Sequence, residues 1–187
     1  MRFARVKRKT KETDVLVEVD LDDKGYEIET TIPFFNHMLE TLALHSEIKV
    51  TIKASGDLKH HIIEDVGIAL GESIRKALGD KKGIKRFGSC IIPMDESVAI
   101  CGIDISGRGI FNLDGEIKGY IEGVDAEVFQ HFFETLCRTS GINAYIQVKG
   151  KNLHHMIEAI FKAFAKSFKD AIKIEGEEVR STKGSLL

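Results

Sequence analysis

HMLETLALHSEIKVTIKASGDLKHHIIEDVGIALGESIRKAL, at positions 37–78, lies over HFFETLCRTSGINAYIQVKGKNLHHMIEAIFKAFAKSFKDAI, at positions 131–172, without a gap. The two stretches are 94 positions apart and share 15 of 42 residues, where chance would give about two or three. A weaker echo at a shift of 84 places EVDLDDKG near residue 18 over GIDISGRG near residue 102. The sequence therefore predicts a duplicated unit, with one half-domain at 1–85 and the other at 86–187.

Hydrophobic periodicity predicts the same elements in each half. Period-two alternation indicates strands, and apolar residues three and four apart indicate amphipathic helices. The expected strands lie at 14–22, 26–32 and 47–55, then at 89–106, 109–117 and 142–150. The expected helices lie at 34–44 and 60–78, then at 126–138 and 154–172. We therefore expect an α+β fold: a duplicated half-domain with a mixed β-sheet and two helices, the helices of the two halves packed together.

Composition excludes several classes of protein. The 187 residues are 43% hydrophobic and 30% charged, with a formal net charge of −2, which gives no reason to expect nucleic acid or a membrane as partner. The N-terminus, MRFARVKRKTKETD, is basic but no apolar segment follows it, so no secretory signal is predicted. Cys90, Cys101 and Cys137 have no paired spacing, which argues against disulfides and thiolate metal sites. We expect a cytoplasmic protein.

Six of the seven histidines belong to the repeat. They form the pairs His37/His131, His60/His154 and His61/His155, and the repeat also shares Glu64 with Glu158. The pattern His-x22-His-His-x-x-Glu therefore occurs twice. A single histidine on a helix is usually structural, but two copies at matched spacing favour a metal site.

Helical spacing suggests how these side chains are used. His60 and Glu64 are four residues apart and share a helix face, as do His154 and Glu158. His61 points roughly 100° away from His60. We therefore expect two metal ions, each held by a His-x-x-x-Glu pair and completed by the adjacent histidine of the other repeat, with the two upstream histidines adding further imidazoles. Imidazole and carboxylate without thiolate suit Mn, Zn, Fe, Co or Ni.

His45 stands apart because position 139, its counterpart, is Thr. It follows His37 by eight residues and shares that helix face. We interpret it as a substrate contact or an acid/base group, with a purely structural role as the alternative.

Seven segments occur in an order that resembles the imidazoleglycerol-phosphate dehydratase family over essentially the full chain. They are FFNHMLETLALHS, HHIIEDVGIALG, IKRFGS, PMDE, DISGRG, HHMIEAIFKAFA and STKG. The resemblance implies a duplicated α+β fold like the second domain of ribosomal protein S5, and two Mn ions per subunit. It also implies a homo-oligomer of 24 subunits with sites between subunits. The implied reaction is a hydro-lyase step of histidine biosynthesis, which removes water from D-erythro-imidazole-glycerol phosphate to give imidazole-acetol phosphate.

The resemblance also assigns residues. The positions matching metal ligands are His37, His60, His61, Glu64, His131, His154, His155 and Glu158. Those matching substrate-binding positions are Arg86, Arg108, Lys162, Ser181, Thr182 and Lys183, the last three in the C-terminal tail. Cations and hydroxyls of this kind suit a phosphate. Glu12 matches an active-site glutamate and is the candidate for proton transfer, with His45 or a metal-bound water as the other candidates.

Some positions depart from the family pattern, and two other functions fit the same residues. Asn36, Thr41 and Tyr145 stand where Asp, Gln and His are common, and the segment before His60 is short. A dimetal phosphoesterase would use two ions and a phosphate site equally well, but it would release inorganic phosphate. A non-catalytic metal-binding or shell-forming protein would bind metal without turnover.

Overall fold

The computed structural model describes residues 1–186, and its elements fall into two matching series. The first is β1 (Phe3–Lys9), β2 (Thr13–Asp20), β3 (Gly25–Glu29), α1 (Pro33–Ser46), β4 (Lys49–Gly56) and α2 (Lys59–Leu78). The second is β5 (Phe87–Met94), β6 (Ser97–Asp104), β7 (Phe111–Asp114), α3 (Glu127–Ser140), β10 (Asn143–Lys149) and α4 (Leu153–Ala171). A short hairpin, β8 (Tyr120–Ile121) and β9 (Val124–Asp125), precedes α3 in the second series only.

The two series form sheets of the same topology. The strand order is β1-β2-β4-β3 in the first sheet and β5-β6-β10-β7 in the second. In each sheet the last strand runs parallel to its neighbour, β3 to β4 and β7 to β10, and the other neighbours are antiparallel. The mixed sheets and the four helices confirm the α+β duplication that the sequence predicted.

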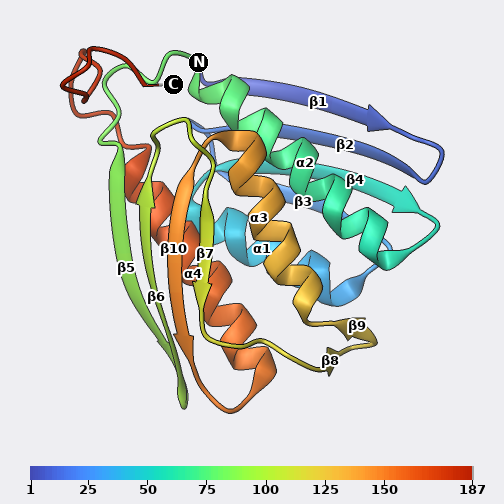
Figure 1. Cartoon of the computed structure of the whole chain (residues 1–187). Coiled ribbons are helices and arrows are strands. Elements are labelled where there is room, and N and C mark those ends of the chain that lie inside the picture. Colours follow the sequence, from blue (N-terminus) through green and yellow to red (C-terminus); the bar gives the residue numbers. More distant parts are fainter. Residues whose placement is uncertain (187) are drawn as a thin grey trace.

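The four helices lie between the two sheets (Figure 1). Within each half, α2 covers β1 and β2, and α4 covers β5 and β6. Across the halves the helices pair crosswise, α1 with α4 and α2 with α3. This contact is rich in aromatic rings, and Phe35, Phe132 and Phe161 are fully buried in it. One continuous core therefore joins the two halves.

Three strands were not resolved correctly by periodicity. Strand β1 was not predicted because its segment is basic, yet Ala4 and Val6 are buried while Arg5 and Lys7 face solvent. The stretch 89–106, predicted as one strand region, is a hairpin of β5 and β6. Its turn contains Asp95, which adopts a positive φ of 49°.

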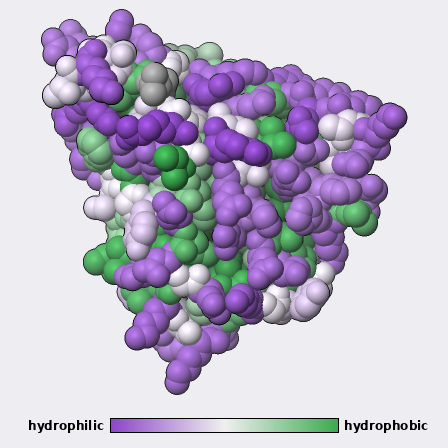
Figure 2. Space-filling view, in the orientation of Figure 1, coloured by the Kyte–Doolittle hydropathy of each residue, from purple (hydrophilic) through white to green (hydrophobic). Residues whose placement is uncertain are grey.

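The outer faces of the two sheets differ in character. The second sheet exposes Phe87, Ile91, Ile100 and Tyr145, at 40–65% of their full surface. Hydrophobic side chains gather on that side of the molecule (Figure 2). The first sheet instead carries ion pairs on its strands, among them Arg5 with Glu18, Lys9 with Asp14 and Lys53 with Glu27.

Two further sequence predictions can be compared with the structure. In the described part of the chain, no helix is both long and apolar enough to cross a bilayer. The three cysteines are free thiols, Cys90 half-buried and the other two buried. Burial raises the pKa of the Cys101 thiol to about 12.

Candidate metal centre and active site

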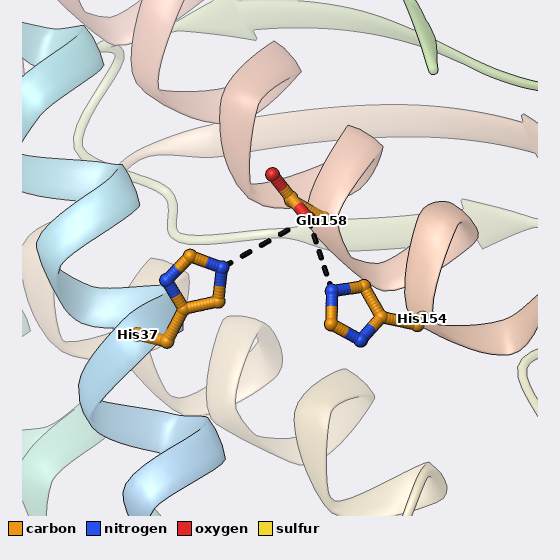
Figure 3. A group of neighbouring side chains, drawn as sticks. All are labelled: His37, His154 and Glu158. Carbon is orange, nitrogen blue, oxygen red and sulfur yellow. Dashed lines mark hydrogen bonds and ion pairs between the residues drawn. The ribbon is translucent and has the colours of Figure 1, made fainter. Parts of the chain in front are cut away.

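His37, His154 and Glu158 form a cluster across the two halves of the chain (Figure 3). One nitrogen or oxygen atom of each lies within 4.8 Å of the others. Glu158 Oε2 is 3.1 Å from His154 Nε2 and 3.9 Å from His37 Nε2. His37 comes from α1 and the other two from α4, so the crosswise helix pairing creates this cluster.

Local sequence places these side chains at helix starts. Pro33 opens α1, where its fixed φ and missing N–H suit the first turn. The Asn152 side chain caps α4 by accepting hydrogen bonds from the backbone N–H groups of His154 and His155. The cap sets the first turn of α4, and Glu158 follows one turn later on the face of His154.

Glu158 is an ionised carboxylate in a half-closed site. Its side chain is 10% exposed, and Lys162 Nζ lies 2.7 Å from its Oε1 atom. Burial alone would raise the pKa of Glu158, but the hydrogen bond and charge of Lys162, together with His37 and His154, lower it. A buried carboxylate beside two imidazoles is a donor set that fits a divalent transition metal.

The equivalent groups at the α2/α3 helix pair form a second arrangement with a longer His–Glu distance. The rings of His60 and His131 have centroids 5.9 Å apart, and His60 Nε2 lies 3.9 Å from Glu64 Oε2. His131 Nδ1 faces Glu134 at 3.2 Å instead. The same crosswise geometry thus recurs between α2 and α3, with a His–Glu distance longer than the 3.1 Å at the His37 cluster.

His61 and His155 point away from both groups, as their helix position predicted. His61 Nδ1 lies 2.8 Å from Asp57 Oδ1, and His155 Nδ1 lies 2.8 Å from Glu96 Oε2. Within one chain the structure does not bring either histidine to the His-x-x-x-Glu pair of the other repeat. Their hydrogen bonds to carboxylates raise the pKa of both imidazoles.

Glu12 and His45, the candidates for proton transfer, lie in different places. Glu12 ends the β1–β2 turn, with its Oε2 atom 3.7 Å from His61 Nδ1 and its side chain 56% exposed. His45 lies two turns beyond His37 on α1 and is half-buried against α4. Burial lowers the pKa of His45, and the charges of Lys162 and Lys166 lower it further. His45 is therefore neutral at neutral pH.

Five of the six predicted substrate-binding residues gather in one hollow. This cation pocket has a volume of about 490 Å³. Its lining includes Arg86, Arg108, Arg180, Ser181, Thr182 and Lys183. Asp104 holds Arg86 through two hydrogen bonds of 2.7 and 3.2 Å. The structure places Lys162 elsewhere, on Glu158 and near Met94.

The cation pocket and the His37 cluster lie at opposite ends of α4. The backbone N–H of Arg86 donates to the carbonyl of Ala171 at the C-terminal end of that helix. Ala171 is thirteen residues beyond Glu158, which corresponds to about 20 Å along the axis. A single chain therefore holds the two groups too far apart for one small phosphate ester to touch both.

The comparisons with known proteins identify the family. A sequence model described as imidazoleglycerol-phosphate dehydratase matches residues 30–168. The chain belongs to the imidazoleglycerol-phosphate dehydratase family. Its relatives include the imidazoleglycerol-phosphate dehydratases of Archaeoglobus fulgidus, 50% identical over 96% of this chain and 97% of the relative, and of Methanosarcina mazei, 46% identical over the full length of both.

Solved structures of the family share the fold. The imidazoleglycerol-phosphate dehydratase of Staphylococcus aureus superimposes with a TM-score of 0.85 at 32% identity, over 92% of this chain and 99% of that chain. The Pyrococcus furiosus structure gives 0.86 at 38% identity, over 97% and 100%. Membership confirms the family that the motif order predicted, and with it the hydro-lyase class.

Sequence reasoning missed two carboxylates, Asp57 and Glu96. The structure shows that each accepts a hydrogen bond from one of the diverging histidines. For Asp57 a signal was available, because it precedes His61 by four residues. Glu96 comes from a separate turn, and the signals for it were the shift of 84 that relates it to Glu12 and its place in the family segment PMDE. Asn36 and Tyr145, two departures from the family pattern, bond Thr30 and Asp114 respectively and belong to neither cluster.

Proposed function

We propose that this chain eliminates water from D-erythro-imidazole-glycerol phosphate to give imidazole-acetol phosphate, in the histidine pathway. The observation that carries the proposal is the cluster of His37, His154 and Glu158, built from both halves of a chain of this family. We place the reaction in the cytoplasm.

Two manganese ions per chain are the proposed cofactor. His37, His154 and Glu158 would hold one ion, and His131, His60 and Glu64 the other. His61 and His155 would complete the coordination from neighbouring copies, because neither reaches a cluster of its own chain. The bound ions would polarise the imidazole ring as Lewis acids and serve as a template for the substrate.

The remaining site residues bind the substrate and move protons. The guanidinium groups of Arg86 and Arg108, with Ser181, Thr182 and Lys183, would hold the phosphate through charge-assisted hydrogen bonds. Fixing that end orients the reacting carbons. Glu12 is the proposed proton-transfer group, because its carboxylate is exposed and accepts no hydrogen bond among residues 1–186. His45 and Lys162 lie on α1 and α4, the helices that carry the His37 cluster, and would contact the substrate.

The separation along α4 supports sites formed between subunits. A phosphate in one chain's cation pocket would meet the metal cluster of another chain. The apolar outer face of the second sheet offers surface for such contacts. The proposed assembly is a homo-oligomer, with 24 subunits as the family resemblance implies.

Product analysis tests the proposed reaction. The manganese-loaded protein is incubated with imidazole-glycerol phosphate, and the ketone and free phosphate are both measured. We expect the ketone without phosphate release. Phosphate release would favour the phosphoesterase, and metal binding without either product would favour the non-catalytic shell protein.

Metal removal tests the proposed assembly. An ion that binds only the assembled form stabilises it by mass action. Elemental analysis of the manganese-loaded protein should give two equivalents per chain, and light scattering should show smaller species after chelation, with recovery when manganese is returned. A particle of unchanged mass after verified metal removal would refute the linkage between metal and assembly.

A further inference from the structure

Two histidines that the proposed function assigns to the metals are each held by a carboxylate through the same ring atom. His61 Nδ1 lies 2.8 Å from Asp57 Oδ1, and His155 Nδ1 lies 2.8 Å from Glu96 Oε2. An ionised carboxylate only accepts hydrogen bonds, so Nδ1 must be the donor in both rings. A neutral ring protonated at Nδ1 carries its lone pair on Nε2. In His155 this atom lies 3.5 Å from Oδ2 of the exposed Asp95 side chain, beyond an ordinary hydrogen-bond distance.

Glu96 is built into the fold as a fixed acceptor. Its Oε1 atom accepts hydrogen bonds from the Ser97 hydroxyl at 2.9 Å and from the backbone N–H groups of Lys151 and Asn152 at 3.3 and 2.7 Å. Its other oxygen, Oε2, is left for His155. Four donors thus fix the orientation of one carboxylate that links the β5–β6 turn to the start of α4.

The matching turn of the first half has a different arrangement. Glu12 precedes Thr13 at the start of β2 as Glu96 precedes Ser97 at the start of β6. Glu12 lies 3.7 Å from His61 Nδ1, too far for a hydrogen bond. Asp57 makes that bond instead, and its own counterpart in the second half is Lys151, which has no carboxylate.

We propose that Glu96 and Asp57 are positioning residues that hold His155 and His61 as Nδ1–H tautomers, so that the Nε2 lone pair can bind a metal ion of a neighbouring copy. In the second half, Glu96 of the β5–β6 turn holds His155 in this way. In the first half Asp57 holds His61, which leaves the equivalent glutamate, Glu12, free to exchange protons with substrate. This inference rests on the proposed metal function and assigns the carboxylates behind it. Carboxylates behind a ligating histidine fix its tautomer and orientation in many metal sites.

The sharpest test is Glu96→Gln. The three donors on Oε1 hold the amide oxygen at that position, so the amide NH2 replaces Oε2 and faces His155. An N–H donor there requires Nδ1 to accept, which moves the ring proton to Nε2 and removes the lone pair offered to the metal. Asp57→Asn has a different prediction, because Oδ1 accepts both from His61 and from the Leu58 N–H at 2.7 Å. Its amide oxygen stays in place and the His61 tautomer is kept.

Manganese titration of the chelated protein measures the first consequence. We expect Glu96→Gln to lower the affinity for one of the two manganese ions about 10- to 100-fold, which is the usual effect of removing a carboxylate behind a ligating histidine. The exposed control Glu116→Gln should stay near the parent affinity. A parent chain that binds no metal would refute the proposed function. A parent that binds two ions and a Glu96→Gln variant that binds them equally well would overturn this inference alone.

Nitrogen NMR of the imidazole rings in the metal-free protein measures the tautomer directly and does not depend on activity. At a pH above the raised pKa of its ring, where the imidazole is neutral, His155 should carry its proton on Nδ1 in the parent chain and on Nε2 in Glu96→Gln, with His155→Gln used for assignment. A parent spectrum with His155 protonated on Nε2 would overturn the proposal even if the variant failed to fold. So would a loss of metal in the variant without a change of tautomer.

Discussion

The helix pairs α1/α4 and α2/α3 are copies of one arrangement, yet the residues beyond their shared histidines and glutamates differ. Both carry the same ligand types, His37 with the α4 pair and His131 with the α2 pair. Two helical turns beyond the first histidine of each helix, the α1/α4 pair has His45 and Lys162. The α2/α3 pair has Thr139 and Ile68 at the equivalent positions.

The two helix pairs also differ in how closely their helices approach each other. At α2/α3, a Cβ atom on Gly71 would lie 2.6 Å from the Leu136 carbonyl oxygen, and one on Gly67 would lie 3.1 Å from the Phe132 carbonyl oxygen. The counterparts of these glycines in α4 are Ala165 and Phe161. At these glycines the backbones of α2 and α3 therefore lie close together, while the equivalent positions of α4 carry side chains. The difference teaches that duplication kept the histidines and glutamates of the pattern while the residues around them changed, and the proposed substrate contacts lie at α1/α4.

The largest effect is expected from Lys162→Met. The change removes the cation beside the buried Glu158 carboxylate and a proposed substrate contact. Losing a charge-assisted hydrogen bond costs about 1.5–3 kcal/mol, so kcat/KM should fall roughly 10- to 100-fold. The matched control is Ile68→Met, the same final residue at the equivalent position of the other pair, which should be nearly silent. Equal losses of kcat/KM in both variants would mean that the two helix pairs do not differ in this way.

Arg108→Ala tests the same asymmetry at the far end of α4. Its counterpart at a shift of 84 is Lys24, which pairs with Glu47 at 2.6 Å and lines no cation pocket. Arg108→Ala and Lys183→Ala should each weaken substrate capture by about 1.5–3 kcal/mol in kcat/KM. Lys24→Ala is the control. An unchanged kcat/KM in both pocket variants would exclude these residues from the phosphate site.

Gly71→Ala should destabilise the α2/α3 pair. The new methyl group meets a backbone carbonyl that has little room to move, and overpacking of this kind costs about 1–3 kcal/mol. The reverse change at the counterpart, Ala165→Gly, should cost about 0.5–1 kcal/mol through helix propensity. Urea unfolding of the chelated protein measures both. A neutral Gly71→Ala variant would mean that the helices can separate there without penalty.

The smallest effect concerns His45. Its pKa in the folded state lies below the ordinary 6.5, so the unfolded chain binds its proton more readily. This group therefore lowers stability as the pH falls below about 6.5, and has no such effect above it. His45→Thr, which introduces the residue of the other pair, should flatten the fall of Tm between about pH 6.5 and 5. The chelated protein is used, and an identical slope in parent and variant would contradict the assignment.

The repeat predicted the fold well because its signal is spread over many positions. Crosswise pairing of helices could not be predicted, because periodicity gives the apolar face of a helix but not its partner. Strand β1 was missed since alternating Arg and Lys conceal the buried Ala4 and Val6. At the site, shared spacing predicted the histidines and glutamates, of which the structure brings His37, His154 and Glu158 together, and Lys162 was assigned from the family pattern. Glu96 was missed because its link to His155 joins residues 59 positions apart.

The length of α4 between the cation pocket and the metal cluster has a genetic consequence. If each site combines the pocket of one chain with the cluster of another, two different defective alleles can complement each other. Chains lacking Arg108 and chains lacking His154 would each leave a cell dependent on added histidine. In mixed particles, an intact cluster from the first chain can meet an intact pocket from the second, and growth would return. Two alleles damaged within the same cluster would never complement, so crosses between mutants would sort the residues by the group to which they belong.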